Sequence, residues 1–178
     1  MNLTNVRRIF GPEFEPNREI DFVWLAGEAA KHKKIVEIGA FSGRTTRVLT
    51  DNTTGQVISV DDWTGGTDEE CKRIIAEHPV YEEFLANTKD CKNLQVLKMS
   101  SLDAAAALEG KTFDLIFIDA SHDYESVKAD ILAWLPLLAP GGLLCGDDIG
   151  FPGVVKAVNE LLPGNSRVAG SFWSWYGK

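Results

Sequence analysis

The stretch that decides the fold of this chain reads Val36-Glu37-Ile38-Gly39-Ala40-Phe41-Ser42-Gly43-Arg44-Thr45-Thr46. An apolar strand is predicted over residues 35–38, and a helix is predicted over 45–51, after a glycine-bearing turn. Gly39 and Gly43 let the backbone turn sharply and approach a ligand without an intervening Cβ. The stretch therefore predicts a strand, a ligand-binding turn and a helix in direct succession.

Further strands and helices alternate on either side of this unit. Strands are expected at 57–60, 94–97, 113–118, 143–145 and 168–176, and helices at 19–31, 124–138 and 152–162, with Pro140-Gly141-Gly142 ending the second helix. Nearly continuous apolar strands between helices indicate an α/β fold, a doubly wound parallel sheet covered on both faces. We expect a single domain over 1–178 with an N-terminal extension at 1–18, and ligands at the carboxyl ends of the strands.

The composition of the chain argues against some classes of binding partner. The 178 residues are 44% hydrophobic and carry a formal net charge of −8, which repels nucleic-acid phosphates. No run of about 18 apolar residues predicts a membrane span, and the three cysteines do not form a C-x-x-C pattern. We expect a cytoplasmic protein that binds neither nucleic acid nor membrane, and the sequence is compatible with a homo-oligomer.

The turn departs from the nucleotide-binding fingerprints. Phe41 stands where a dinucleotide site needs its second glycine, and no Gly-Lys-Ser/Thr sequence completes a phosphate loop. Glu37, a carboxylate on the strand before the turn, suits a cationic ligand better than a phosphate. These residues argue against a nicotinamide dehydrogenase.

Carboxylates follow three of the predicted strands. Asp61 and Asp62 end the strand at 57–60, Asp119 ends 113–118, and Asp147 and Asp148 follow 143–145. Since parallel strands end at one edge of the sheet, the last three can converge. Such oxygen ligands suit Mg²⁺ or another divalent cation. The alternative is that one aspartate caps a helix and another binds a cofactor amine, without a metal.

His122 follows Asp119 by three residues. Its imidazole has an ordinary pKa near 6.5 and can accept a hydroxyl proton at neutral pH. The other interpretation is that His122 caps the helix that begins near Tyr124.

The glycine turn and the first acidic pair together resemble the class I S-adenosylmethionine-dependent methyltransferases over residues 19–162. The resemblance implies a Rossmann-like, mostly parallel sheet of seven strands. It also implies that Glu37 and the turn hold the methionine part of the cofactor, Asp61 the ribose, and Ser100 and Ser101 the adenine. The cofactor-binding residues that we expect are Glu37, Gly39, Ala40, Phe41, Gly43, Thr45, Asp61, Asp62, Trp63, Ser100, Ser101 and Asp119.

The segment Phe-Ile-Asp-Ala-Ser-His-Asp-Tyr-Glu-Ser-Val, with the later Gly-Asp-Asp, is most similar to methyltransferase family 24 and the macrocin-type sugar O-methyltransferases. In their metal-dependent members, residues matching Asp119, Asp147 and Asp148 bind Mg²⁺, and one matching His122 is the base. Trp63 also matches a segment of that group. The chain has little beyond the core, so substrate identity does not carry over.

The resulting expectation is an S-adenosylmethionine-dependent O-methyltransferase that acts on a small hydroxylated acceptor, sugar-like or phenolic, with a divalent metal. Asp119 and His122 are the expected catalytic residues. The alternatives are a metal-independent N- or O-methyltransferase and a non-catalytic module that binds the cofactor. A mere binder has no use for His122 beside three aspartates. A nucleic-acid methyltransferase would need an Asn/Asp-Pro-Pro-aromatic tetrad, which the sequence lacks.

Overall fold

A computed structural model describes residues 16–168 and 170–177. The helices are α2 (Pro16–Ala29), α3 (Arg44–Asn52), α4 (Glu69–Glu77), α5 (Val80–Thr88), α6 (Ser101–Ala107), α7 (Tyr124–Trp134) and α8 (Pro152–Leu161), with a short 3-10 helix η1 (Leu135–Leu137). The strands are β1 (Lys34–Ile38), β2 (Gln56–Asp61), β3 (Leu94–Lys98), β4 (Phe113–Ile118), β5 (Leu138–Gly146), β6 (Ser166–Arg167) and β7 (Trp173–Tyr176). Most of the predicted extension at 1–18 lies outside the described residues.

The strands form one seven-stranded sheet in the order β3-β2-β1-β4-β5-β7-β6. Strands β1 to β5 pair in parallel, and β7 pairs antiparallel with both β5 and β6. This confirms the predicted Rossmann-like, mostly parallel sheet. The strand order reverses between β1 and β4, which is where ligands bind in open sheets of this kind.

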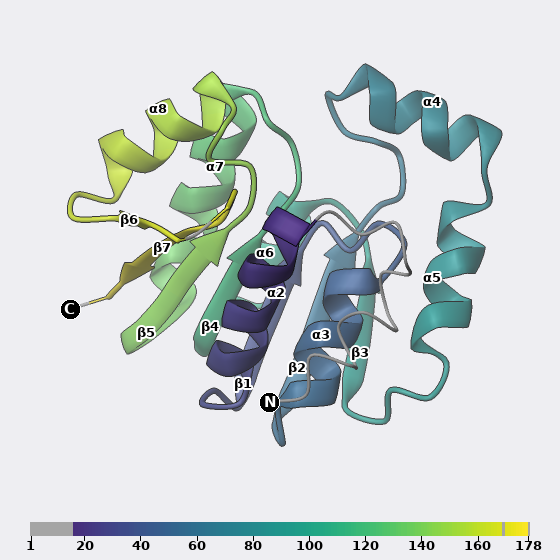
Figure 1. The fold of residues 1–178 in the computed structure, drawn as a ribbon, viewed down its shortest axis with the longest axis horizontal. Coiled ribbons are helices and arrows are strands. Elements are labelled where there is room, and N and C mark those ends of the chain that lie inside the picture. Colours follow the sequence, from purple (N-terminus) through teal and green to yellow (C-terminus); the bar gives the residue numbers. More distant parts are fainter. Residues whose placement is uncertain (1–15, 169, 178) are drawn as a thin grey trace.

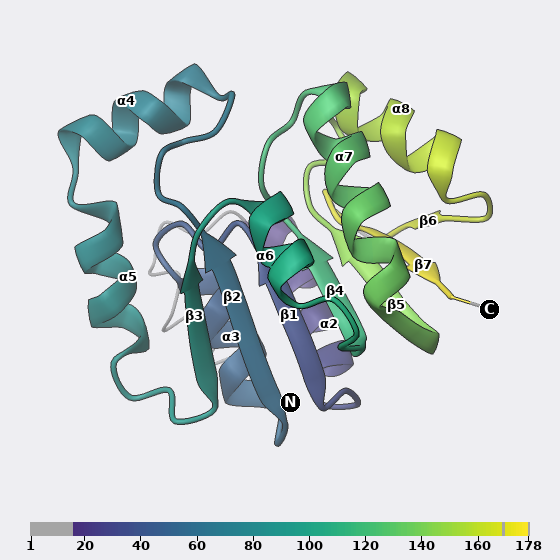
Figure 2. The ribbon, with the colours of Figure 1, turned by 180° about the vertical axis from the view of Figure 1, so that it is seen from behind.

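Helices cover both faces of the sheet, α2 and α3 on one (Figure 1) and α6, α7 and α8 on the other (Figure 2). Two clusters of buried apolar side chains fill the layers between sheet and helices. Leu25, Leu49 and Phe117 belong to the first, and Ile116 and Trp134 to the second. Because strand residues face both layers, β1 and β4 are nearly continuously apolar, as the sequence indicated.

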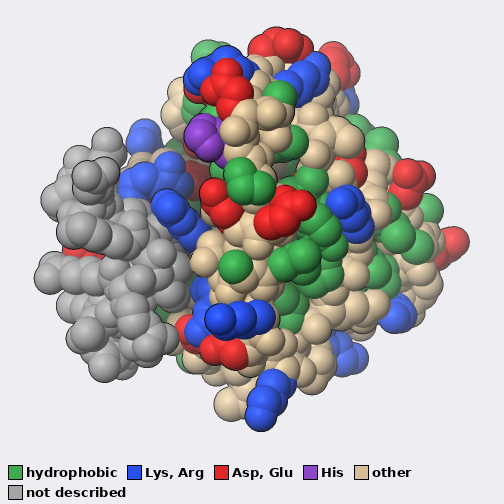
Figure 3. All heavy atoms as spheres, turned by 90° about the vertical axis from the view of Figure 1, so that its right-hand side faces the viewer, with side chains coloured by type: hydrophobic (Ala, Val, Ile, Leu, Met, Phe, Trp, Pro, Cys, Tyr) green, Lys and Arg blue, Asp and Glu red, His purple; other side chains and the backbone are tan. Residues whose placement is uncertain are grey.

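Helices α4 and α5 lie between β2 and β3 in the chain and were not predicted from the sequence. Helix α4 buries none of its residues completely. Figure 3 shows the face that carries α4 and α5, where acidic and basic side chains are interspersed. Arg73 pairs there with both Glu70 and Glu77 on α4. Helix α6 was also missed, because it has only seven residues.

Two predicted boundaries near the C-terminus were wrong. Pro140 lies inside β5 rather than before it, because β5 begins at Leu138 and its register with β4 shifts between Phe113 and Leu115, the irregularity at which a strand tolerates proline. The predicted strand at 168–176 is interrupted by a turn in which Gly170 has a φ of 82°, so only β7 continues the sheet.

Within the described residues, no helix combines the length and apolar character that crossing a membrane requires.

Candidate active site

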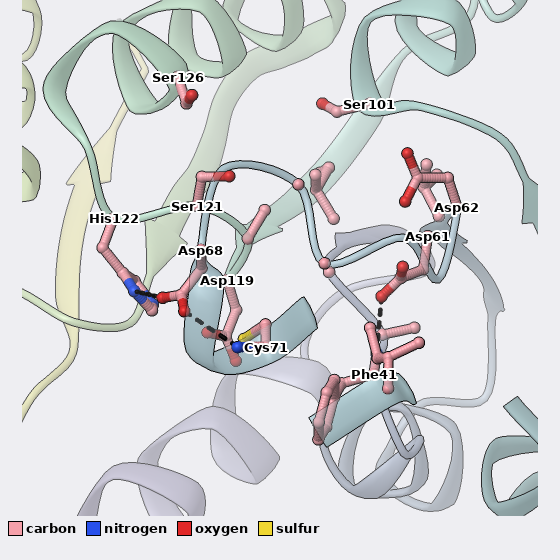
Figure 4. A pocket seen from close by; sticks show the side chains of 18 of the residues that line it. Phe41, Asp61, Asp62, Asp68, Cys71, Ser101, Asp119, Ser121, His122 and Ser126 are labelled. Carbon is pink, nitrogen blue, oxygen red and sulfur yellow. Dashed lines mark hydrogen bonds and ion pairs between the residues drawn. The ribbon is translucent and has the colours of Figure 1, made fainter. Parts of the chain in front are cut away.

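A cavity of about 990 Å³ lies at the carboxyl ends of β1, β2 and β4. Figure 4 shows two groups of side chains around it, Phe41 with Asp61 and Asp62 on one side, and Asp119 with His122 on the other. Of the expected cofactor residues, those that line the cavity are Gly39, Ala40, Phe41, Thr45, Asp61, Asp62, Ser100, Ser101 and Asp119. Those that do not are Glu37, Gly43 and Trp63.

The two glycines of the first turn are required by packing. A Cβ on Gly39, whose φ is 88°, would lie 1.8 Å from the backbone oxygen of Asp119. A Cβ on Gly43, whose φ is 79°, would lie 2.8 Å from the ring of Phe84 on α5. The first glycine therefore lets the β1 turn meet the loop after β4, and the second lets α3 approach α5.

Glu37 lies beneath the cavity rather than in its wall. Its side chain is fully buried, and Oε2 accepts hydrogen bonds from the hydroxyls of Thr46 and Ser59, each at 2.5 Å. Oε1 has no hydrogen-bond partner in the described structure. Burial, opposed by the two hydroxyls, raises the pKa of Glu37 to about 7. The carboxyl group thus ties β1 to α3 and β2.

Asp61 organises the cavity wall at the end of β2. Its Oδ2 accepts from the backbone N–H of Phe41 at 2.8 Å, and its Oδ1 accepts from that of Trp63 at 2.7 Å. A carboxylate has about four acceptor positions, so positions remain for ligand hydroxyls. Burial raises the pKa of Asp61 above its ordinary value.

Trp63 supports the turn from outside the cavity. Its indole Nε1 donates to the backbone oxygen of Phe41 at 2.8 Å, and its ring packs against Tyr81 and Phe84. Phe41 and Trp63 have positive φ angles of 44° and 56°, and Asp148 has one of 64°. Such backbone strain in non-glycine residues is concentrated at functional sites, and here it marks loops that follow β1, β2 and β5.

The wall near β3 contains a carboxyl group that sequence reasoning missed. Ser101 Oγ donates to Asp130 Oδ1 at 2.5 Å and accepts from the indole of Trp134 at 2.9 Å, so the hydroxyl of Ser101 is already engaged. Ser100 caps α6 through the backbone N–H of Asp103. Burial raises the pKa of Asp130 to about 6. Asp130 lies on α7, 29 residues from Ser101, so no local pattern indicated it.

The predicted acidic cluster is present. One carboxylate oxygen from each of Asp119, Asp147 and Asp148 lies within 4.8 Å of the other two. Burial, followed by the charges of Asp147 and Asp148, raises the pKa of Asp119 well above its ordinary value. Burial also raises the pKa of Asp147. Arg18 of α2, which the sequence analysis did not single out, makes an ion pair with Asp147.

His122 lies between two carboxylates. Its Nε2 is 2.8 Å from Asp148 Oδ2, and its Nδ1 is 3.0 Å from Asp68 Oδ2. The ring of Phe151 stacks on the imidazole at a centroid distance of 4.5 Å. The hydrogen bond with Asp148 is the largest cause that raises the pKa of His122 to about 9, against the opposing effect of burial. Each ring nitrogen thus lies within hydrogen-bond distance of a carboxylate oxygen, an arrangement that favours the protonated imidazole.

The alternative interpretation of His122 as a helix cap is wrong. Asp123 is the N-cap of α7, and its carboxylate accepts from the backbone N–H of Ser126. The same carboxylate accepts from Thr67 Oγ1 at 2.6 Å. Together with the contact between Asp68 and His122, this bond joins the segment before α4 to the loop after β4.

Helix α4 forms the outer wall of the cavity, which sequence reasoning also missed. The α4 side chains that line it are Cys71, Ile74 and Ile75, and His78 follows at the C-cap. By contrast, the aromatic side chains of Tyr81, Trp173 and Trp175 do not line the cavity. The wall is therefore apolar where α4 covers it and acidic at the end of β4, where Asp119 is the member of the acidic cluster that lines the cavity.

Comparison with known proteins places this site in context. The family model described as a methyltransferase domain, family 24, matches residues 36–149, well over half of the chain. A curated relative, uncharacterized protein y4gI of Sinorhizobium fredii (strain NBRC 101917 / NGR234), is 25% identical over 131 residues. That match covers 71% of this chain but 14% of y4gI, so the chain spans only a small part of that relative.

Among solved structures, the O-methyltransferase from Bacillus cereus in complex with SAH has a TM-score of 0.67 at 19% identity, covering 99% of this chain and 90% of that one. TomG from Streptomyces achromogenes, an O-methyltransferase of tomaymycin synthesis in complex with SAM, has a TM-score of 0.66 at 18% identity, covering 99% and 88%. At these identities the similarity is one of fold. The family model, however, extends from β1 to the end of β5 and includes Asp61, Asp119, His122, Asp147 and Asp148. The chain belongs to methyltransferase family 24.

Proposed function

We propose that this chain transfers the sulfonium methyl group of S-adenosylmethionine to a hydroxyl group of a small acceptor, sugar-like or phenolic, with the assistance of a divalent cation. The observation that carries the proposal is the cluster of Asp119, Asp147 and Asp148, whose oxygens lie within 4.8 Å of one another beside the cavity. A module that only bound the cofactor would not need this cluster next to His122.

The cavity fits the cofactor on the side of β1 and β2. Asp61 keeps free acceptor positions toward the cavity, and a carboxylate is a strong acceptor for the two ribose hydroxyls. Asp130 and the backbone before α6 line the region where the adenine would lie. Glu37 supports this region from below instead of contacting the ligand, because it is fully buried.

The acidic cluster fits a divalent cation. Asp119 and Asp148 have partly exposed side chains, and hard carboxylate oxygens are the ligands that Mg²⁺ and Mn²⁺ prefer. When bound, the cation would orient the acceptor oxygen and lower its pKa. Asp119, at the end of β4, is the member of this cluster that also lines the cavity, and it would align the two reactants.

His122 would accept the acceptor's proton, but only in its neutral form. The raised pKa of about 9 depends first on the hydrogen bond with Asp148. When Asp148 serves as a ligand, its carboxylate is no longer available to hold the imidazole as a cation. The role of His122 as a base therefore depends on how Asp148 is engaged.

A second candidate is a metal-independent methyltransferase that acts on nitrogen or oxygen. The ion pair between Arg18 and Asp147 favours it, because a guanidinium already supplies positive charge to the cluster. In that case turnover would be insensitive to chelation.

The test has two steps. S-adenosylhomocysteine should raise the melting temperature by binding to the folded state, while NAD should not. Methyl transfer from labelled S-adenosylmethionine to a panel of sugars and phenols is then measured with EDTA or with Mg²⁺. Activity that EDTA abolishes supports the proposal, and full activity in EDTA selects the metal-independent candidate. Protection by NAD alone would refute the assignment of the cofactor.

A further inference from the structure

We propose that Arg18 is a built-in counter-cation that competes with a divalent cation for Asp147. The inference rests on the metal site of the proposed function and concerns how that site is regulated. Without an ion, the guanidinium would balance the cluster. An ion that binds the cluster would have to displace it.

The geometry places Arg18 where a metal would need access. Arg18 lies near the start of α2, lines the cavity, and contacts Asp147 Oδ2 through Nη2. The side chain of Arg18 is 38% exposed, whereas that of Asp147 is 2% exposed. The guanidinium therefore reaches from the rim of the cavity to a carboxylate that is otherwise shielded from water. The guanidinium carbon Cζ lies 5.8 Å from the ring centroid of Phe22, which also lines the cavity.

The other oxygen of Asp147 is already engaged. Oδ1 accepts from Ser171 Oγ and from the backbone N–H of Asp148 at 2.6 Å. Oδ2 is consequently the oxygen with capacity for a cation, and Arg18 occupies it. A divalent ion and the guanidinium cannot share this oxygen at low cost, because two cations would be held a few ångströms apart.

The balance of charge explains why a counter-cation is present. Asp21, one turn after Arg18 on α2, is a fourth carboxylate, and it reaches the cluster through Ser171, whose backbone N–H donates to Asp21 Oδ2 at 2.8 Å. Asp21 is fully buried, and its Oδ1 has no hydrogen-bond partner in the described structure. Arg18 therefore supplies one positive charge beside four carboxylates.

Calorimetric titration with Mn²⁺ tests the competition directly. Arg18→Gln should bind Mn²⁺ at least about tenfold more tightly than the wild type, because the competing charge is removed. Arg18→Lys, which keeps the charge but loses the planar fork, should lie between the two. Arg47→Gln is the matched control. This variant removes an arginine that pairs with Asp51 and Asp90 outside the cavity. The affinity of Arg47→Gln for Mn²⁺ should therefore equal that of the wild type.

Thermal unfolding in EDTA and in Mn²⁺ gives a second measurement. Arg18→Gln leaves Asp147 buried without its ion pair, so its melting temperature in EDTA should be lower than that of the wild type. Addition of Mn²⁺ should raise the melting temperature of the variant more than that of the wild type. If Arg18→Gln does not fold, Arg18→Lys still has to bind Mn²⁺ more tightly than the wild type.

The outcomes separate this inference from the proposed function. Equal affinity in the wild type and both Arg18 variants overturns the competition while leaving the metal site in place. Absence of Mn²⁺ binding in all of them overturns both the competition and the metal assistance. Neither result affects binding of S-adenosylhomocysteine, which tests the methyltransferase assignment independently.

Discussion

The two sides of the cavity hold their carboxylates in different ways. Beside β1 and β2, Asp61 is held by backbone N–H groups, and Glu37 by the hydroxyls of Thr46 and Ser59. Beside β4 and β5, the charged side chain of Arg18 holds Asp147, and Asp148 contacts the imidazole of His122 (Figure 4 shows His122 across the cavity from Asp61). The first arrangement uses neutral donors alone, whereas the second adds charged side chains to neutral donors, and an ion or a substrate can replace those charged side chains.

This difference indicates which side of the cavity is suited to cofactor binding and which side to chemistry. A carboxylate fixed by backbone donors keeps its position when the ligand changes, which suits a cofactor that must bind in every cycle. A carboxylate balanced by charged side chains can exchange them for another cation, which suits proton transfer and metal binding. We therefore expect variants beside β4 and β5 to change turnover, and variants of Asp61 to change the affinity for the cofactor product.

The largest expected effect is on the side of β4 and β5. His122→Ala should lower turnover by roughly 10²-fold to 10⁴-fold, the usual contribution of a positioned acid or base. Its affinity for S-adenosylhomocysteine should be unchanged, because the contacts of His122 are with Asp68 and Asp148. The measurements are steady-state turnover with an accepted acceptor and calorimetry with the cofactor product.

His32→Ala is the control for this variant, since His32 contacts the backbone oxygen of Glu28 away from the cavity. Turnover of the control should equal that of the wild type. A loss smaller than tenfold in His122→Ala, or a weakened affinity for S-adenosylhomocysteine, would contradict the separation of the two sides.

The same difference explains what the sequence could predict. The β1 turn and Asp61 were predicted because their contacts lie within a single β-α-β unit. The convergence of Asp119, Asp147 and Asp148 followed from the rule that parallel strands end at one edge. Arg18 was missed because it is 129 residues from Asp147, and no local pattern connects them.

Local propensity also failed where burial is weak. Helix α4 has no fully buried residue, because its apolar stripe of Cys71, Ile74 and Ile75 faces the cavity. That stripe and the cap by Asp68, which accepts from the backbone N–H groups of Glu70 and Cys71, are the signals that could have indicated the helix. The engagement of His122 could not be foreseen either, because Asp68 reaches it across 54 residues. The sequence therefore placed His122 beside the acidic cluster but not between two carboxylates, Asp68 and Asp148.

A smaller effect is expected from Glu37, beneath the side of β1 and β2. Its pKa rises from an ordinary 4.5 to about 7 in the folded state. Below pH 4.5 the group is protonated whether the chain is folded or not, so it contributes no pH dependence there. Between pH 4.5 and 7 the unfolded chain ionises first, and the folded state loses up to about 3 kcal/mol of stability.

Glu37→Gln removes this dependence while keeping an oxygen that accepts from Thr46 and Ser59. Urea unfolding at pH 4.5, 6 and 8 should show that the free energy of unfolding of the variant rises relative to that of the wild type as the pH rises. A difference between the two proteins that is the same at all three pH values would mean that folding does not raise the pKa of Glu37.

The smallest of these effects concerns Asp61. Asp61→Ala should weaken binding of S-adenosylhomocysteine by about 1.5 to 3 kcal/mol, because a charge-assisted contact with the ribose is lost. Asp62→Ala is the control, because Asp62 already accepts hydrogen bonds from the backbone N–H and the hydroxyl of Thr64. This variant should lose less binding free energy for S-adenosylhomocysteine than Asp61→Ala. Calorimetry with and without Mn²⁺ should give the same loss for Asp61→Ala, because the cofactor side holds its carboxylates without charged side chains. A larger loss in Asp62→Ala would move the ribose contact to Asp62, and a loss that depends on Mn²⁺ would show that the two sides are coupled.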